Sequence, residues 1–475
     1  MKPTDYPTAI WSDVADDLDD PANCIQGVAN LTDKGVTLEI PFGYLGATDQ
    51  QIGFASTKPH FDYLFGMTVD GKYLALLDAR EQSSTMHFGK GFARQTLAAD
   101  WLLASSSPID PTLKIYSVEV TACGLREWLN NPPFDVTSTL RELDGRLQHE
   151  ATELLFLSDK MKQKELYRSE TETIAVDTSV SSSGSINGGK WHITYDNSLC
   201  YHSATPMSFD VAIDKAFKLA DFVSLMTGRT AAVRSISVKL ENQDCWVKCY
   251  ASLTSSEYDD DPEIHAIPFP ISSFSDAEVA EALDKWMHCD KYVNQATKMM
   301  LAALSERKGY LQSSFFMSSQ MLETFAYNGK KTQALPQEEV ERRLKTLLDG
   351  VTDPEICEWA THKLKGMNTV SSKQLLGELI KELSPASSLL IGDTGQFLKM
   401  QHDYRNACAH PSIYKEKGLQ GEDIFYHTRL IVFLGYMAAL HKICLTPEKI
   451  EQRLKDSNYQ WWLFNKIRRL YPAAE

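Results

Sequence analysis

Residues 403–411, with the sequence DYRNACAHP, bring together the side chains of this chain that are best suited to chemistry. They place a permanent cation (Arg405), an amide (Asn406) and an imidazole (His410) within one short stretch. RNA carries its own nucleophile, the 2′-hydroxyl, so its cleavage needs a base for that proton and an acid for the leaving 5′-oxygen. Histidine does either near neutral pH, and arginine stabilises the charge that builds up on the phosphoryl oxygens. These residues therefore predict cleavage of an RNA phosphodiester without a metal or another cofactor.

The surrounding sequence predicts that these side chains lie at the end of a helix. A helical pattern covers 393–410, and Pro411 ends it because proline cannot continue a helix. Asn406 and His410 are four residues apart and share a helix face. Arg405 lies about 140° around the helix from His410, but its long side chain can fold toward the same end.

The spacing of arginine and histidine is a weak signal by itself. Arg80 and His87 have a similar spacing on a turn-like, acidic stretch, and we interpret that pair as a coincidence. A structural alternative also stays open for the C-terminal stretch, in which Arg405 bonds Asp403 and His410 only caps the helix. Cys408 lies between two alanines, which favours a packing role over that of a nucleophile.

The N-terminal part of the chain, 1–275, has mainly the alternating pattern of β-strands. The strands that it predicts are 35–40, 73–77, 114–120, 190–195, 235–240 and 245–253. A helix is predicted over 208–226, and 181–189 has the composition of a mobile Gly/Ser-rich loop. Residues 136–168 are ambiguous, with leucines at helical spacing.

The C-terminal part, 276–475, has helical patterns almost without interruption, each with a cap or a breaker at one or both ends. The predicted helices are 276–307, 309–328, 337–349, 354–367, 372–384, 393–410, 421–444 and 447–469. We therefore expect an α+β chain, in which a β-rich N-terminal domain is followed by an all-α helical bundle.

Composition excludes several classes of protein. No apolar run approaches the roughly 20 residues that a membrane helix needs, and the N-terminus lacks the apolar core of a signal peptide, so we expect a cytoplasmic protein. The nine cysteines include no CxxC pair, which argues against a metal site. The net charge of −15 is uneven, since 291–475 carry +5 and 1–290 carry −20. The acidic part repels nucleic acid, whereas the basic part can approach it.

One copy of the motif supplies a single imidazole, whereas acid and base together favour two. A symmetric homodimer that pairs two copies of the 393–410 helix would supply both. This hypothesis makes the homodimer part of the predicted active site.

The motif Arg-Asn-x-x-Ala-His at a helix tip resembles the signature of HEPN ribonucleases. These domains dimerise and cleave RNA without a metal in a cleft built from two motifs. The resemblance implies that Arg405 and His410 are catalytic and that Asn406 supports them. Residues 315–323 resemble an early HEPN helix with its acidic residue, which implies that Glu323 faces the site.

The N-terminal part resembles the ApeA N-terminal domain of anti-phage proteins. The resembling stretches are 35–40, 114–129, 222–228 and 233–240. The resemblance implies a sensor or regulatory domain over 1–275 and a nuclease domain over 276–475. It also implies abortive infection, in which an unidentified phage component triggers cleavage of host RNA, in this family tRNA. A non-catalytic HEPN module that binds or scaffolds is the alternative.

Further residues near the motif are candidates for supporting roles. Asp403 and Tyr404 flank it, and Tyr404 could stack on a base. The lysines that could guide RNA toward the cleft are Lys330, Lys331, Lys415 and Lys417. For Trp461 and Trp462, docking on the protein's own bundle is favoured over stacking on nucleic acid. His402 and His427 are expected at the surface or the edge of the core.

Overall fold

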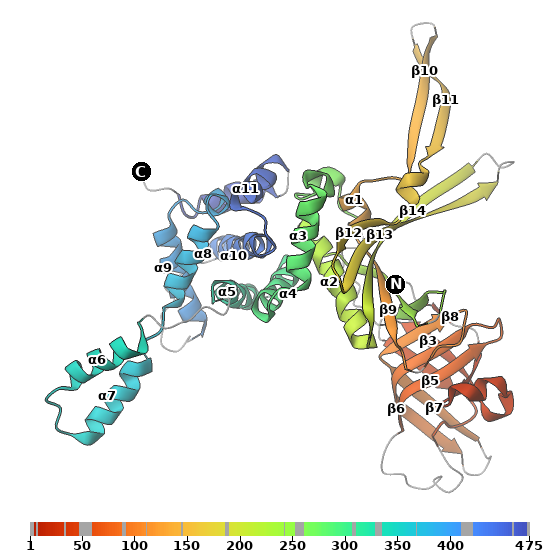
Figure 1. Ribbon diagram of the computed structural model, residues 1–475, viewed down its shortest axis with the longest axis horizontal. Helices are drawn as coiled ribbons and strands as arrows, with labels where there is room; N and C mark the ends of the chain where they lie inside the picture. The colour runs from red at the N-terminus through yellow and green to blue at the C-terminus, as the bar shows by residue number, and fades with distance from the viewer. Residues whose placement is uncertain are drawn as a thin grey trace. The chain divides into compact units, whose positions relative to one another are not determined.

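The computed structural model describes the whole chain except residues 1–3, 6–7, 33–34, 47–58, 88–91, 111, 144–145, 186–189, 242, 252–260, 306–309, 328–334, 367, 410–420, 458–459 and 473–475. The chain forms two compact units (Figure 1). The N-terminal unit comprises 1–227, 231–264 and 270–280, and the helical unit comprises 228–230, 265–269 and 281–475.

An antiparallel sheet forms the framework of the N-terminal unit. Its strands are β1 (Thr4–Asp5), β2 (Ala9–Ser12), β3 (Ile25–Thr32), β4 (Gly35–Ile40), β5 (His60–Thr68), β6 (Tyr73–His87), β7 (Phe92–Ala99), β8 (Trp101–Ser105), β9 (Ile115–Ala122), β12 (Lys164–Arg168), β13 (Glu172–Ser185), β14 (Lys190–Met207), β15 (Val233–Leu240) and β16 (Val247–Tyr250). Helices α1 (Leu125–Leu129) and α2 (Phe209–Thr227) pack against this sheet. The predicted strand 35–40 and the predicted helix 208–226 are thereby confirmed.

Six strands of the sheet close into a ring, because β6 pairs with β5 on one side and with β7 on the other. Alternate residues point inward and form the core, in which Trp11 and Leu38 are fully buried. The absence of a side chain at Gly66 leaves space for the Trp11 indole, since a Cβ at that position would lie 2.8 Å from the ring.

The ambiguous segment 136–168 forms no helix. Its first part is a β-hairpin of β10 (Phe134–Leu143) and β11 (Arg146–Phe156), which projects from the sheet of this unit (Figure 1). The leucines at helical spacing lie on two different strands, and β-branched residues such as Val136 favour the extended backbone. The predicted 181–189 loop is also partly wrong, because Ser181 to Ser185 pair with β14.

The helical unit consists mainly of α-helices. They are α3 (Asp276–Met287), α4 (Lys291–Ser305), α5 (Leu311–Tyr327), α6 (Gln337–Leu348), α7 (Pro354–Gly366), α8 (Ser372–Glu382), α9 (Thr394–Ala409), α10 (Glu422–Lys442), α11 (Pro447–Asp456) and α12 (Trp461–Arg468), with α3 beginning in the N-terminal unit. The expected β-rich part followed by an all-α part is thereby confirmed.

Two predicted helices are divided in the structure. The segment 276–307 is split into α3 and α4, because the Asp290 carboxylate accepts hydrogen bonds from the backbone of Tyr292 and Val293 and so caps a new helix. The segment 447–469 is split into α11 and α12, and Gln460 just before α12 has a left-handed backbone with φ of 46°.

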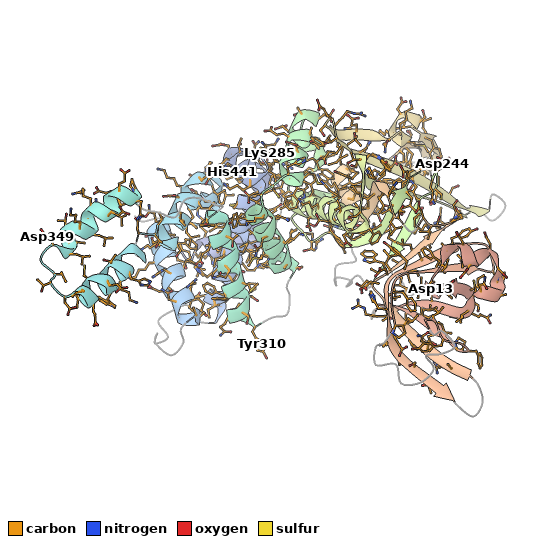
Figure 2. The ribbon with its side chains drawn as sticks, turned by 60° about the horizontal axis from the view of Figure 1, so that its bottom comes forward. Asp13, Asp244, Lys285, Tyr310, Asp349 and His441 are labelled. Carbon is orange, nitrogen blue, oxygen red and sulfur yellow. The ribbon has the colours of Figure 1, made fainter. Side chains whose placement is uncertain are left out.

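Helix α10 forms the centre of the helical unit. Its residues from Leu430 to Leu440 are buried, and it packs against α4 and α5. Gly435 permits close approach to α5, since a Cβ there would lie 2.5 Å from the sulfur of Met321. In contrast, α6 and α7 pack on each other and extend from this unit, with Asp349 at their turn (Figure 2). Among the residues described, no helix is long and apolar enough to cross a membrane.

Candidate active site

Helix α9 carries the predicted motif and has two distinct faces. The Asp393 carboxylate accepts a hydrogen bond from the backbone of Gln396 and caps its start. Phe397, Gln401 and Tyr404 follow at helical spacing and are buried against the bundle. The side of the helix that carries His402, Arg405 and Asn406 is less buried and is therefore the one that can meet a substrate.

A cavity of about 230 Å³ opens on that second face. Helices α5, α8 and α9 supply its walls. The lining residues are Glu323, Ser372, Lys373, Leu376, Leu398, Gln401, His402, Arg405 and Asn406. The structure thus places three sequence-predicted residues, Arg405, Asn406 and Glu323, around one cavity.

Arg405 forms an ion pair with Glu323 across this cavity. Its Nε lies 3.4 Å from a carboxylate oxygen of Glu323, and the two side chains are 30% and 21% exposed. The contact is an ion pair and not a hydrogen bond, because Nε has no hydrogen-bond partner among the described residues, and the Arg405 side chain stays partly exposed. Asp403 does not line the cavity, and within the described part of the chain the ion pair of Arg405 is to Glu323. The alternative in which Arg405 is held by Asp403 therefore loses its support.

The Tyr404 side chain has a packing role instead of the predicted stacking on a base. It is 8% exposed, and its ring contacts Phe315 edge to face with 4.5 Å between the ring centres. The physical reason is its place on the buried face of α9, three residues after Gln401.

Several predicted residues lie outside the described residues. They are His410, Lys330, Lys331, Lys415 and Lys417. The roles predicted for them, including that of His410 as a catalytic imidazole, stay predictions.

A buried chain of hydrogen bonds supports α9 from beneath the cavity. The Gln401 amide donates to the Ser319 hydroxyl at 3.0 Å, and its oxygen lies 2.8 Å from Nε2 of His427. Nδ1 of His427 lies 2.7 Å from the Tyr471 hydroxyl. The polar atoms are matched if His427 is neutral with its proton on Nε2. Burial lowers the pKa of His427 to about 3, which agrees with a neutral ring.

Sequence reasoning missed this network and placed one of its residues wrongly. His427 was expected at the surface or core edge but is fully buried, whereas His402 is exposed, as expected, and lines the cavity. A signal for His427 was present, because it opens the apolar run of α10 at the spacing of a core residue. Nothing in the sequence linked it to Gln401 or Tyr471, since the three lie on separate segments.

The other reactive candidates have structural roles. Arg80, which has a similar spacing to His87, forms ion pairs with Asp78 at 2.8 Å and Asp100 at 2.5 Å.

Burial raises the pKa of the Cys408 thiol, which disfavours the nucleophilic thiolate. Helix α12 docks on the bundle through Phe464, which contacts Phe433, although the neighbouring Trp462 is 65% exposed.

Comparison with known families agrees with the two-part architecture. The model of the ApeA N-terminal domain 1 matches residues 13–286, and the model of the Apea-like HEPN domain matches residues 316–449. No curated protein and no solved structure matches the chain. The HEPN match supports a ribonuclease role in anti-phage defence. Since the N-terminal match alone covers more than half of the chain, the chain belongs to the ApeA-type anti-phage proteins, with an ApeA N-terminal domain followed by a C-terminal HEPN domain.

Proposed function

We propose that the chain is a metal-independent endoribonuclease of the HEPN type, with Arg405 and His410 as catalytic residues and Asn406 in support. The observation that carries the proposal is the cavity on α9, where Arg405 is held by Glu323 beside Asn406. The cavity lies within the segment that matches the Apea-like HEPN domain. A cation that lines a cavity suits recognition of a phosphodiester.

The reaction follows from the chemistry of RNA. A base removes the 2′-hydroxyl proton, O2′ attacks phosphorus, and the bond from phosphorus to O5′ breaks while an acid protonates O5′. The products are a 2′,3′-cyclic phosphate and a 5′-hydroxyl. Arg405 donates to the phosphoryl oxygens as their negative charge grows, and His410 transfers one of the protons.

Glu323 positions Arg405 for this task. An exposed arginine samples many rotamers, whereas an ion pair at 3.4 Å narrows them before the substrate arrives. Because both side chains are partly exposed, the pair adds little to the stability of the fold. Its contribution is orientation of the guanidinium toward the cavity.

The biological role that we propose is defence by abortive infection. In this role the N-terminal part, 1–275, senses a phage-derived trigger, and the part 276–475 then cleaves host RNA, with tRNA as the preferred class. The ApeA N-terminal match and the −20 charge of 1–290 support a regulatory rather than an RNA-binding part. The proposed guides for RNA are Lys330, Lys331, Lys415 and Lys417. We also propose that the HEPN part assembles as a homodimer.

A total-RNA assay tests the nuclease. The full-length protein is incubated with total RNA, EDTA and a lysate of phage-infected cells, and fragments are analysed for their ends. We expect fragments that end in 2′,3′-cyclic phosphate, with tRNA cut first. His410→Ala and Arg405→Ala should each lower the cleavage rate at least about 10²-fold, the usual effect of losing an acid–base group or a charge stabiliser.

The chain offers a matched control in Arg80→Ala, which removes an arginine of similar spacing to a histidine outside the cavity. This variant should cleave like the wild type. Intact RNA with the wild type under these conditions would favour the non-catalytic binding module. Cleavage that persists in His410→Ala would assign the chemistry to other residues.

A further inference from the structure

A larger cavity, in the N-terminal unit, has no part in the proposed nuclease. Its volume is about 710 Å³, and every described residue that lines it belongs to that unit. Strands β12, β13 and β14, which lie side by side in the sheet, contribute to its walls (Figure 1). The end of α1 and the 3₁₀ helices Ser158–Met161 and Ile271–Ser273 contribute the rest. The volume lies in the range of roughly 300–1,000 Å³ that is usual for small-molecule sites.

Three lysines line this cavity within five consecutive residues of the chain, namely Lys160, Lys162 and Lys164. Lys162 forms an ion pair with Asp159 at 2.8 Å, and Lys164 forms one with Asp276 at 3.1 Å. In the part of the chain that the structure describes, no carboxylate pairs with Lys160, whose side chain is partly buried. Lys160 is therefore available to an anionic group of a ligand.

The remaining charges favour a small anion as this ligand. The carboxylate of Glu165, which also lines the cavity, lies 2.5 Å from the guanidinium of Arg168 and is neutralised by it. The cavity thus has a positive surplus, although residues 1–290 together carry a charge of −20. A long RNA would be repelled by that acidic surface, whereas a ligand with one or two charges experiences mainly the nearby lysines.

A buried amide in the same cavity adds a second requirement. Asn197 lines the cavity and is 2% exposed, and its nitrogen donates to the Thr178 hydroxyl at 2.8 Å. Its Oδ1 is buried and has no hydrogen-bond partner among the described residues. A buried acceptor without a donor is unfavourable, so a ligand that reaches this oxygen must bring an N–H or O–H group. The exposed amides of Asn130 and Asn131 offer further donors and acceptors.

We propose that this cavity binds a small nucleotide, with its phosphate at Lys160 and its base at Asn197. A phosphate group by itself offers the lysines an anion but supplies mainly acceptors, and a free base supplies N–H donors but no anion. A nucleotide carries both groups in one molecule. The apolar side chains of Leu129, Val176 and Ile271, which also line the cavity, provide contact area for the base.

Isothermal titration calorimetry with the full-length protein tests the site. The probes are AMP, GMP, CMP and UMP, and ribose 5-phosphate and inorganic phosphate serve as ligands that lack a base. We expect at least one nucleotide to bind with a Kd below about 1 mM and at least about 10-fold more tightly than either base-free ligand. Lys160→Ala should weaken this binding about 10- to 100-fold, the usual effect of losing a hydrogen bond to a charged group. Lys72→Ala, which removes an exposed, ion-paired lysine outside the cavity, should bind like the wild type.

Asn197→Ala tests recognition of the base. The variant should bind the nucleotide about 10-fold more weakly and ribose 5-phosphate as tightly as the wild type does, because the sugar phosphate does not use the amide. Urea titration verifies that the variant is folded, since Asn197 is buried. If it does not fold, the double variant of the exposed residues, Asn130→Ala with Asn131→Ala, provides the same comparison between the two ligands.

Arg405→Ala separates this site from the cavity on α9, and it should leave nucleotide binding unchanged. Four results overturn the inference. They are no binding of any of the four nucleotides at about 1 mM, equal losses in Lys160→Ala and Lys72→Ala, a loss in Arg405→Ala without one in Lys160→Ala, and equal affinities for nucleotides and inorganic phosphate. None of these measurements requires cleavage of RNA, so the outcome is independent of the proposed nuclease.

Discussion

Histidine 427 should make the stability of the protein depend on pH in a defined direction. Its ring is fully buried, and its two nitrogens contact Gln401 and Tyr471. A proton on Nδ1 would place a charge in the core and would meet the Tyr471 hydroxyl, which could then no longer donate to it. Burial accordingly lowers the pKa of His427 to about 3 in the folded protein.

The magnitude follows from linkage. An unfolded histidine has a pKa of about 6.5. Between about pH 6.5 and 3, the imidazole of His427 is therefore protonated in the unfolded state but not in the folded state. The stabilisation is complete above the unfolded pKa and is lost as the pH falls toward the folded pKa. Each pH unit in that window costs about 1.4 kcal/mol, so lowering the pH from 7 to 5 should remove about 2 kcal/mol through this residue.

Urea unfolding of the wild type and of His427→Gln at pH 7 and pH 5 measures this effect. Circular dichroism at 222 nm follows mainly the helical unit, and light scattering monitors aggregation. The variant should be less stable at pH 7, but its free energy of unfolding should fall by about 2 kcal/mol less than that of the wild type over this pH range. Titrations of other groups cancel in the comparison.

Equal losses of stability in the two proteins would refute the neutral, buried ring. If His427→Gln does not fold, the NMR titration of labelled histidines in the wild type provides the same test. One of the 12 imidazoles should then show no midpoint above about pH 4, because its pKa lies near 3. If all 12 imidazoles showed midpoints above about pH 4, the neutral, buried state of His427 would also be refuted.

Two further substitutions test the packing within the two units. Tyr471→Phe should lower the free energy of unfolding by about 1–3 kcal/mol, because Nδ1 of His427 is left buried without a donor. Urea titration at pH 7 measures this loss, and an unchanged free energy would contradict the hydrogen-bond network. Gly66→Ala should lower the free energy of unfolding by about 1–3 kcal/mol, because the new Cβ would lie 2.8 Å from the rigid indole of Trp11. The loss should appear as a lower melting temperature by tryptophan fluorescence, and an unchanged melt would contradict the close packing.

The sequence was sufficient to locate α9 because its limits are local. Asp393 is a helix cap and Pro411 is a breaker, and both effects act through a few neighbouring residues. The cavity was harder to predict. Glu323 and Lys373 share a cavity with Arg405 only because α5 and α8 pack beside α9. Single-sequence patterns give the faces of helices but not which helices meet.

The hairpin of β10 and β11 is a case in which the periodicity of apolar residues did not predict the local structure. Leucines spaced by three or four residues indicate a helix only if the chain continues without a turn. Here the leucines are divided between the two paired strands β10 and β11, and the β-branched residues of β10 are the better guide. Local propensity was informative at this hairpin, whereas periodicity was not.

The two histidines near Gln401 have opposite environments, since His427 is buried and His402 is exposed, and this contrast affects how the site responds to pH. His427 is kept neutral by burial, so the network that holds α9 does not change as the pH passes through neutrality. His402 lies on the exposed face, where its Nε2 is 3.0 Å from the side-chain nitrogen of Asn406. Because the inner face of α9 holds a neutral ring, a change of pH through neutrality leaves the packing beneath the cavity unchanged. A titrating residue at 427 would instead couple every proton transfer to the packing of Phe397 and Tyr471, which contact its ring.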